Sequence, residues 1–167
     1  MEEYNDEILE RYCNSAISKR LKRELKLMYL LYAQIDVSIT SDKNILISIY
    51  DIIDNRLCKY NFIIPKFYPF TCPVIYYQDR PYIEFLKMTD YELNNRTIFK
   101  KLTGHNCYCC NSFNCDDNWS ASITLIKIID EIRTINKCKR NIIYNLFANK
   151  IKQKYLISDI DLESWLY

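Results

Sequence analysis

The sequence predicts a single α+β domain with an N-terminal helix, a four-stranded antiparallel meander sheet and C-terminal helices. Three observations predict it. Apolar residues at helical spacing occupy the stretch between residues 7 and 31. Runs rich in β-branched and aromatic residues follow, and apolar residues at helical spacing return after Trp119. At 167 residues the chain has the length of one domain.

Residues 7–31 predict one long amphipathic helix. Its apolar positions recur every three to five residues, at Ile8, Tyr12, Ile17, Leu21, Leu25 and Met28. Basic side chains occupy positions between them, at Lys19, Arg20, Lys22, Arg23 and Lys26. The simplest interpretation of these charges is a solvated helix face.

Four runs have the composition of strands: residues 33–39, 45–50, 59–64 and 74–77. Turn-forming residues separate the first three, which indicates an antiparallel meander. Between the last two runs, Pro65, Pro69 and Pro73 exclude both a helix and a central strand. We expect the aromatic residues of this proline corner to pack back over the sheet: Phe67, Tyr68 and Phe70.

The second half of the chain predicts helices around a cysteine-rich loop. Residues 79–103 read as an inserted segment with one or two short helices, and Gly104 then breaks the chain. After Trp119, Ser122 or Thr124 can cap a helix whose shared face contains Ile126, Ile129 and Ile132. Two further helices are expected, at residues 139–155 and 159–166.

Composition and charge exclude several classes of protein. Hydrophobic residues make up 49% and charged residues 26%, as in ordinary globular proteins. A net charge of +2 argues against a general nucleic-acid binder, although the basic helix keeps that option open as a weaker alternative. No apolar run is long enough to cross a bilayer, and the acidic start of the chain does not resemble a secretory signal. We therefore expect neither a nucleic-acid nor a membrane partner.

The eight cysteines are expected to be free thiols, because disulfide scaffolds are usually shorter and richer in loops. This favours a reducing compartment, cytoplasmic or nuclear. The abundance of Ile, Asn, Lys and Tyr beside a single glycine is typical of an AT-rich genome, such as that of a large DNA virus. For a viral protein the expected location is the host cytoplasm or the virion.

Three segments, in this order, resemble a ubiquitin-conjugating enzyme. SKRLKRELKLM is similar to the first helix of that family. FIIPKFYPFTCPVIYY is similar to its strand, Tyr-Pro-Phe corner and next strand, and DNWSASITLIKIIDEI to the loop and helix after its active site. The resemblance spans residues 15 to 135. It implies one UBC-like domain over residues 1–167, with the insertion near residues 79–103 where the family has a short loop.

The resemblance also implies an activity and partners. Members of the family accept ubiquitin, or a relative of it, as a cysteine thioester and pass it to a lysine or to a ligase. Ubiquitin, the activating enzyme and a ligase are therefore the expected partners, and no cofactor is expected. The activating enzyme would dock on the basic face of the first helix, at Lys19, Arg20, Lys22 and Arg23.

Cys110 is the predicted nucleophile. In the family the reactive cysteine lies about eight to ten residues before the tryptophan, and Cys110 precedes Trp119 by nine residues. Cys109, ten residues before Trp119, is the second choice. Asn106 is expected to supply the amide that stabilises the oxyanion, with Asn111 or Asn114 as alternatives.

Two other interpretations stay open. An inactive variant of the family would keep the fold as a binding or structural module. This is favoured by the insertion and by the short segment between His105 and Cys110. A zinc site is the other, with four of five clustered donors as ligands: His105, Cys107, Cys109, Cys110 and Cys115. These lack the paired C-x2-C spacing usual for zinc, so free thiols are favoured and no metal ligand is assigned.

Overall fold

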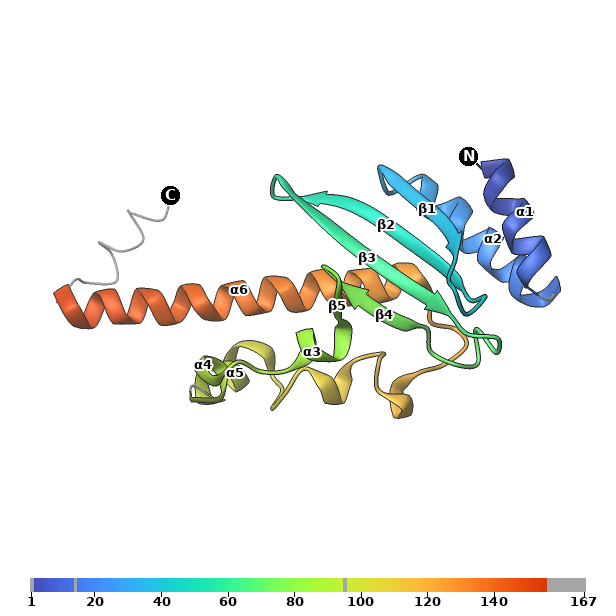
Figure 1. Ribbon diagram of the computed structural model, residues 1–167. Helices are drawn as coiled ribbons and strands as arrows, with labels where there is room; N and C mark the ends of the chain where they lie inside the picture. Colours follow the sequence, from blue (N-terminus) through green and yellow to red (C-terminus); the bar gives the residue numbers. More distant parts are fainter. Residues whose placement is uncertain (1, 14, 95, 156–167) are drawn as a thin grey trace. The chain divides into compact units, whose positions relative to one another are not determined.

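The structure, a computed structural model, describes residues 2–13, 15–94 and 96–155 (Figure 1). The chain divides into two compact units. The first comprises the chain up to residue 87 and residues 107–131, and the second comprises residues 88–106 and the chain from residue 132 onward. In the described residues, no helix is both long and apolar enough to cross a membrane.

The first unit contains a five-stranded antiparallel sheet, which confirms the α+β class (Figure 1). The strands follow chain order: β1 (Gln34–Ile39), β2 (Ile45–Ile53), β3 (Arg56–Ile64), β4 (Val74–Tyr77) and β5 (Arg80–Pro81). The prediction of four strands was wrong by one. Gln78 and Asp79, both at positive φ, form a two-residue turn that returns the chain along β4. Asp79 accepts hydrogen bonds from Lys59 (2.8 Å) and Asn61 (3.3 Å), which fasten this turn to β3.

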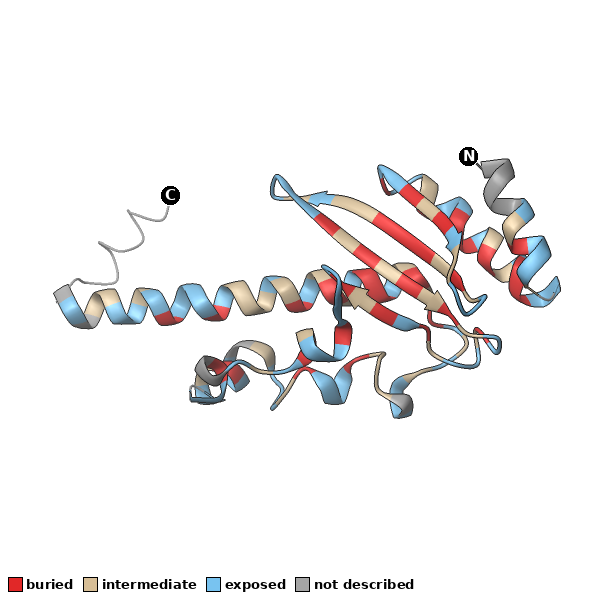
Figure 2. Cartoon of the chain, in the orientation of Figure 1, coloured by how far each residue is buried: buried red, intermediate tan, exposed pale blue. Residues whose placement is uncertain are grey.

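One face of the sheet is buried, as the red segments that alternate along the strands indicate (Figure 2). The register aligns the buried side chains in two rows: Val37, Ile47, Phe62 and Ile75, and Ile35, Ile49, Tyr60 and Tyr77. Each row crosses four strands. The predicted turn at residues 54–56 is confirmed, because Asp54 and Asn55 both have positive φ, as a tight hairpin requires.

Two helices, not one, precede the sheet: α1 (Glu2–Tyr12) and α2 (Ser15–Tyr29). The prediction of a single helix over residues 7–31 was wrong. Asn14 and Ser15, of residue types that favour a helix start, stand at the break. Four of the predicted apolar positions are buried, namely Ile17, Leu21, Leu25 and Met28. Among the described side chains of α1, Leu9 is buried, whereas Tyr12 is 43% exposed.

The proline corner buries only one of its three aromatic residues. Tyr68 is 1% exposed, but Phe67 is 73% exposed and Phe70 is 80% exposed. The expectation that all three pack over the sheet was wrong for the two phenylalanines. The chain turns between the two phenylalanines, where the Phe70 amide donates to the Phe67 carbonyl oxygen (2.8 Å), so the three aromatic side chains do not share one face. A short helix, α3 (Tyr82–Leu86), follows β5 and contacts β4.

The last described helix, α6 (Leu125–Tyr155), runs through both units. The predicted break before residue 139 does not occur, because residues 125–155 contain neither glycine nor proline. Thr124 caps the helix, accepting a hydrogen bond from the Lys127 amide at 3.3 Å. The helix expected at residues 159–166 lies outside the described residues.

The second unit contains two short helices of the expected insertion, α4 (Asp90–Asn94) and α5 (Arg96–Thr103), together with the later part of α6. Thr89 and Glu92 form a capping box at the start of α4. The Thr89 amide donates to the Glu92 carboxylate (2.8 Å), and the Glu92 amide donates to the Thr89 hydroxyl (3.3 Å). The same carboxylate lies 3.6 Å from Lys139 of α6, and both side chains are largely buried. Gly104, at φ 75°, ends α5.

Candidate functional site

Three thiols gather at the cysteine-rich loop of the first unit. They come from Cys107 and from a 3-10 helix at Cys109–Asn111. The Cys107 and Cys110 sulfurs lie 2.8 Å apart, those of Cys107 and Cys109 3.4 Å apart, and those of Cys109 and Cys110 4.0 Å apart. Cys109 and Cys110 are exposed, and Cys107 is half-buried. We call these three residues the thiol cluster.

A carboxylate of α6 fastens the loop that carries the thiol cluster. Glu131 accepts a hydrogen bond from the Ser112 hydroxyl (2.6 Å) and one from the Phe113 amide (2.8 Å). It also accepts the hydroxyl of Tyr82 from α3 (2.5 Å). Burial and the negative charge of Glu131 raise the pKa of Tyr82 well above its usual range, so this hydroxyl keeps its proton. Glu131 thus joins the loop to two helices.

Asn118 closes the same loop from its other end. Its side-chain amide donates to the carbonyl oxygens of Cys110 (2.8 Å) and Ser112 (3.1 Å). The next residue, Trp119, donates its indole N–H to the Pro69 carbonyl oxygen at 2.9 Å. These bonds set the backbone of Cys110 in one place and attach its loop to the proline corner.

A second carboxylate, that of Glu24, joins α2, the proline corner and the start of α6. Glu24 is 3% exposed. It accepts hydrogen bonds from the Tyr68 hydroxyl (2.6 Å) and the Leu125 amide (2.8 Å), and it pairs with Arg20. Arg20 also donates to the Ile123 carbonyl oxygen (3.1 Å). Burial, with the adjacent Glu24 charge, raises the pKa of Tyr68 well above its usual range.

The thiols of the cluster influence each other's ionisation. Hydrogen bonds from Cys110 lower the pKa of Cys107, and those from Cys109 add to this effect. The nearby Cys107 and Cys109 thiols raise the pKa of Cys110 to about 12.

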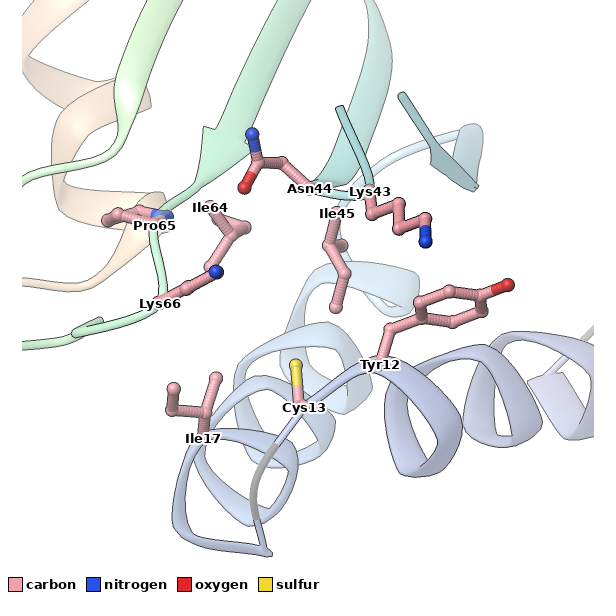
Figure 3. Close-up of a pocket in the computed structure, with 9 residues that line it drawn as sticks. All are labelled: Tyr12, Cys13, Ile17, Lys43, Asn44, Ile45, Ile64, Pro65 and Lys66. Atoms are coloured by element: carbon pink, nitrogen blue, oxygen red, sulfur yellow. The ribbon is translucent and has the colours of Figure 1, made fainter. Parts of the chain in front are cut away.

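A separate cavity, of about 260 Å³, lies where α1 and α2 meet the ends of β2 and β3 (Figure 3). Figure 3 shows the Cys13 side chain directed into it, between Ile17 and Tyr12. Burial raises the pKa of Cys13 to about 11, so this thiol is protonated at neutral pH. Lys43 and Lys66 also line the cavity.

Asn106 and the thiol cluster belong to different units of the chain. Asn106 is exposed and lines a cavity of the second unit beside Lys100 and Lys101. The amide that donates to the Cys110 carbonyl oxygen belongs to Asn118, which was not among the predicted site residues. The role of Asn106 as an oxyanion donor stays a prediction.

Only some of the candidate zinc donors belong to the thiol cluster, and only some of the basic residues of α2 are exposed. Among the residues that the structure describes, Cys115 is outside the group formed by the three thiols, and His105 belongs to the other unit. In α2, Lys19 and Arg23 are exposed, whereas Lys22 pairs with Glu10 at 2.6 Å. Arg20 is engaged with Glu24.

Two residues that form largely buried ion pairs could have been recognised from the sequence, because each is a charged residue on an apolar helix face. Glu24 lies on the apolar face of α2, three residues after Leu21 and four before Met28. Lys139 interrupts the buried positions of α6 between Ile135 and Ile142. A charged residue on an apolar helix face requires a partner, and both have one. Glu131 and Asn118 have no comparable signal.

Compared with protein-family models, with curated proteins and with solved structures, the chain matches none of them.

Proposed function

We propose that this protein carries ubiquitin, or a relative of it, as a thioester on Cys110. The observation that supports this best is an exposed cysteine on a turn whose backbone is held at both ends. Asn118 holds the Cys110 carbonyl oxygen, and Glu131 holds Ser112 and Phe113. Such a turn presents a thiol to a large partner in one orientation, which favours group transfer.

Loading on Cys110 is an exchange of thioesters. Cys110 reacts as a thiolate, so its proton first passes to a base, and the Cys107 sulfur lies 2.8 Å away. The Cys110 sulfur attacks the carbonyl carbon of the modifier's C-terminus on the activating enzyme. A new sulfur–carbon bond forms, the bond to the activating enzyme's cysteine breaks, and that sulfur leaves as a thiolate. ATP consumed by the activating enzyme drives the sequence.

Two exposed surfaces of the first unit suit the partners of this reaction. Lys19 and Arg23 of α2 offer positive charge to an activating enzyme. Phe67 and Phe70 offer apolar side chains on the rigid proline corner, as a ligase site requires. The corner contacts the cysteine-rich loop directly, because the Cys72 thiol lies 3.8 Å from the Phe113 carbonyl oxygen. A ligase bound there would lie beside the loaded cysteine.

The test is a loading reaction with activating enzyme, ubiquitin and ATP. We expect an adduct that reductant cleaves. Cys110→Ser should convert it to an oxygen ester that resists reductant but yields to alkali. Cys115→Ser is the matched control, since this residue is outside the thiol cluster, and it should load as the wild type does.

Two results would contradict the proposal. One is a folded protein that forms no adduct with ubiquitin or with any related modifier, which would favour the inactive binding module. The other is an adduct that remains cleavable by reductant in Cys110→Ser, which would place the thioester on another cysteine.

A further inference from the structure

The thiol cluster has the dimensions of a metal site. In a tetrahedral zinc–thiolate centre, zinc–sulfur bonds of about 2.3 Å place the sulfurs about 3.8 Å apart. The three sulfur–sulfur distances of the cluster, 2.8, 3.4 and 4.0 Å, lie on both sides of this value. All three sulfurs lie within 4.8 Å of one another. Small side-chain rotations would place them at equal distances from one ion.

The local sequence and backbone also suit a metal. Cys107 and Cys110 form one C-x2-C pair, although the second pair usual for zinc is lacking, and the C-x2-C spacing directs two sulfurs to the same point. Cys110 lies in the 3-10 helix that begins at Cys109, and Cys107 precedes this helix by two residues. Backbone amides of Cys109 and Cys110 donate hydrogen bonds to the Cys107 sulfur. Amide donors around a ligating sulfur offset the negative charge that several thiolates bring together.

The thiol cluster is accessible to solvent, and hydrogen bonds fix the backbone that carries it. Cys109 and Cys110 are exposed, so an ion can enter from solvent. Ser112, Glu131 and Asn118 fix the backbone on which the sulfurs stand, so little order has to be gained on binding. Sulfur ligands without an oxygen donor among them select a soft ion over magnesium or calcium.

We propose that Cys107, Cys109 and Cys110 bind Zn²⁺ through three thiolates, with the fourth position of the ion open to water or to an external donor. This inference does not depend on the proposed function, because it concerns the isolated chain. It has one consequence for that function, since a sulfur bound to zinc is not free to form a thioester. Zinc and a loaded modifier would therefore exclude each other at Cys110.

The test is titration of the full chain with Co²⁺, which reports on thiolate ligands by absorption, followed by displacement with Zn²⁺. The protein is first stripped with a chelator and kept reduced with a phosphine. We expect stoichiometric binding, with a thiolate-to-cobalt charge-transfer band that Zn²⁺ abolishes. Replacing any of the three cysteines with serine should weaken Zn²⁺ binding by about 100-fold or more, beyond the loss typical of an outer-shell change.

Cys115→Ser is the matched control, because it removes a thiol from the same loop but not from the cluster. It should retain both the band and the affinity. The inference is overturned if the wild type shows no charge-transfer band, or if Cys115→Ser and Cys109→Ser weaken binding equally. Circular dichroism of each variant separates a lost ligand from a lost fold. No modifier or activating enzyme is present, so failure of loading and failure of metal binding are told apart.

Discussion

At the scale of single residues, the Glu24 carboxylate joins three segments of the first unit. It binds α2 to the proline corner through Tyr68 and to the start of α6 through the Leu125 amide. A buried carboxylate is stable only with such partners, and each partner is in turn left unsatisfied if the carboxylate is removed. Its position between apolar residues of α2 therefore reflects a structural requirement.

We expect Glu24→Ala to lower the free energy of unfolding by about 3 kcal/mol or more, because it leaves a buried hydroxyl, a helix amide and Arg20 without their acceptor. Urea denaturation measures it. Glu10→Ala is the matched control, since its ion pair with Lys22 is largely exposed, and it should change stability by less than about 1 kcal/mol. Equal effects of the two variants would contradict the role given to Glu24.

At the scale of elements, the cysteine-rich loop depends on α6. Within residues 107–119, backbone hydrogen bonds close only short turns, and the Asn118 side chain adds two more bonds. Glu131 provides the attachment from α6 through Ser112 and Phe113. The loop should therefore be more sensitive to Glu131 than α6 itself is.

We expect Glu131→Gln to release the loop while α6 stays folded. A neutral amide is a weaker acceptor than a carboxylate, so the bonds to Ser112 and the Phe113 amide weaken. Hydrogen exchange should show roughly 10-fold faster exchange at Phe113, corresponding to about 1.4 kcal/mol of lost protection. Glu84→Gln, an exposed change on α3, should leave this exchange rate as it was. Unchanged exchange at Phe113 in Glu131→Gln would show that other contacts hold the loop.

At the scale of the whole molecule, two buried tyrosine–carboxylate pairs make stability depend on pH. Tyr68 donates to Glu24 and Tyr82 donates to Glu131, and both tyrosines have a raised pKa in the folded protein. The unfolded chain releases these protons near pH 10, whereas the folded chain retains them. Their stabilisation is therefore complete below about pH 10 and is lost as the pH rises above it.

Unfolding measured by urea between neutral pH and about pH 11 should show this loss. Above about pH 10, each tyrosine should lower the free energy of unfolding by about 1.4 kcal/mol per pH unit. Tyr68→Phe should be less stable at neutral pH, because Glu24 loses a donor, but its decline in alkali should be shallower. The same slope in Tyr68→Phe and in the wild type would exclude Tyr68 as a cause.

Local patterns determined most of the elements in advance. The apolar spacing of residues 17–28, the strand runs and the turn at Asp54 and Asn55 all formed as expected, because each depends on neighbours in the chain. The wrong predictions concerned where elements begin and end. The break near residue 14, the turn at Gln78 and Asp79 and the continuity of α6 depend on which weak local preference prevails. Packing and side-chain bonds decide that.

The sequence by itself determined the α+β class, the helix–sheet–helix order and a cluster of cysteines before Trp119. Only the tertiary structure decided which groups meet. It selected Cys107, Cys109 and Cys110 from the eight cysteines, and it placed Asn118 at the turn. The physical reason is the range of the interactions. Helix and strand patterns arise over a few residues, whereas Glu24 reaches Leu125 across 101 positions of the chain, a pairing that no local pattern encodes.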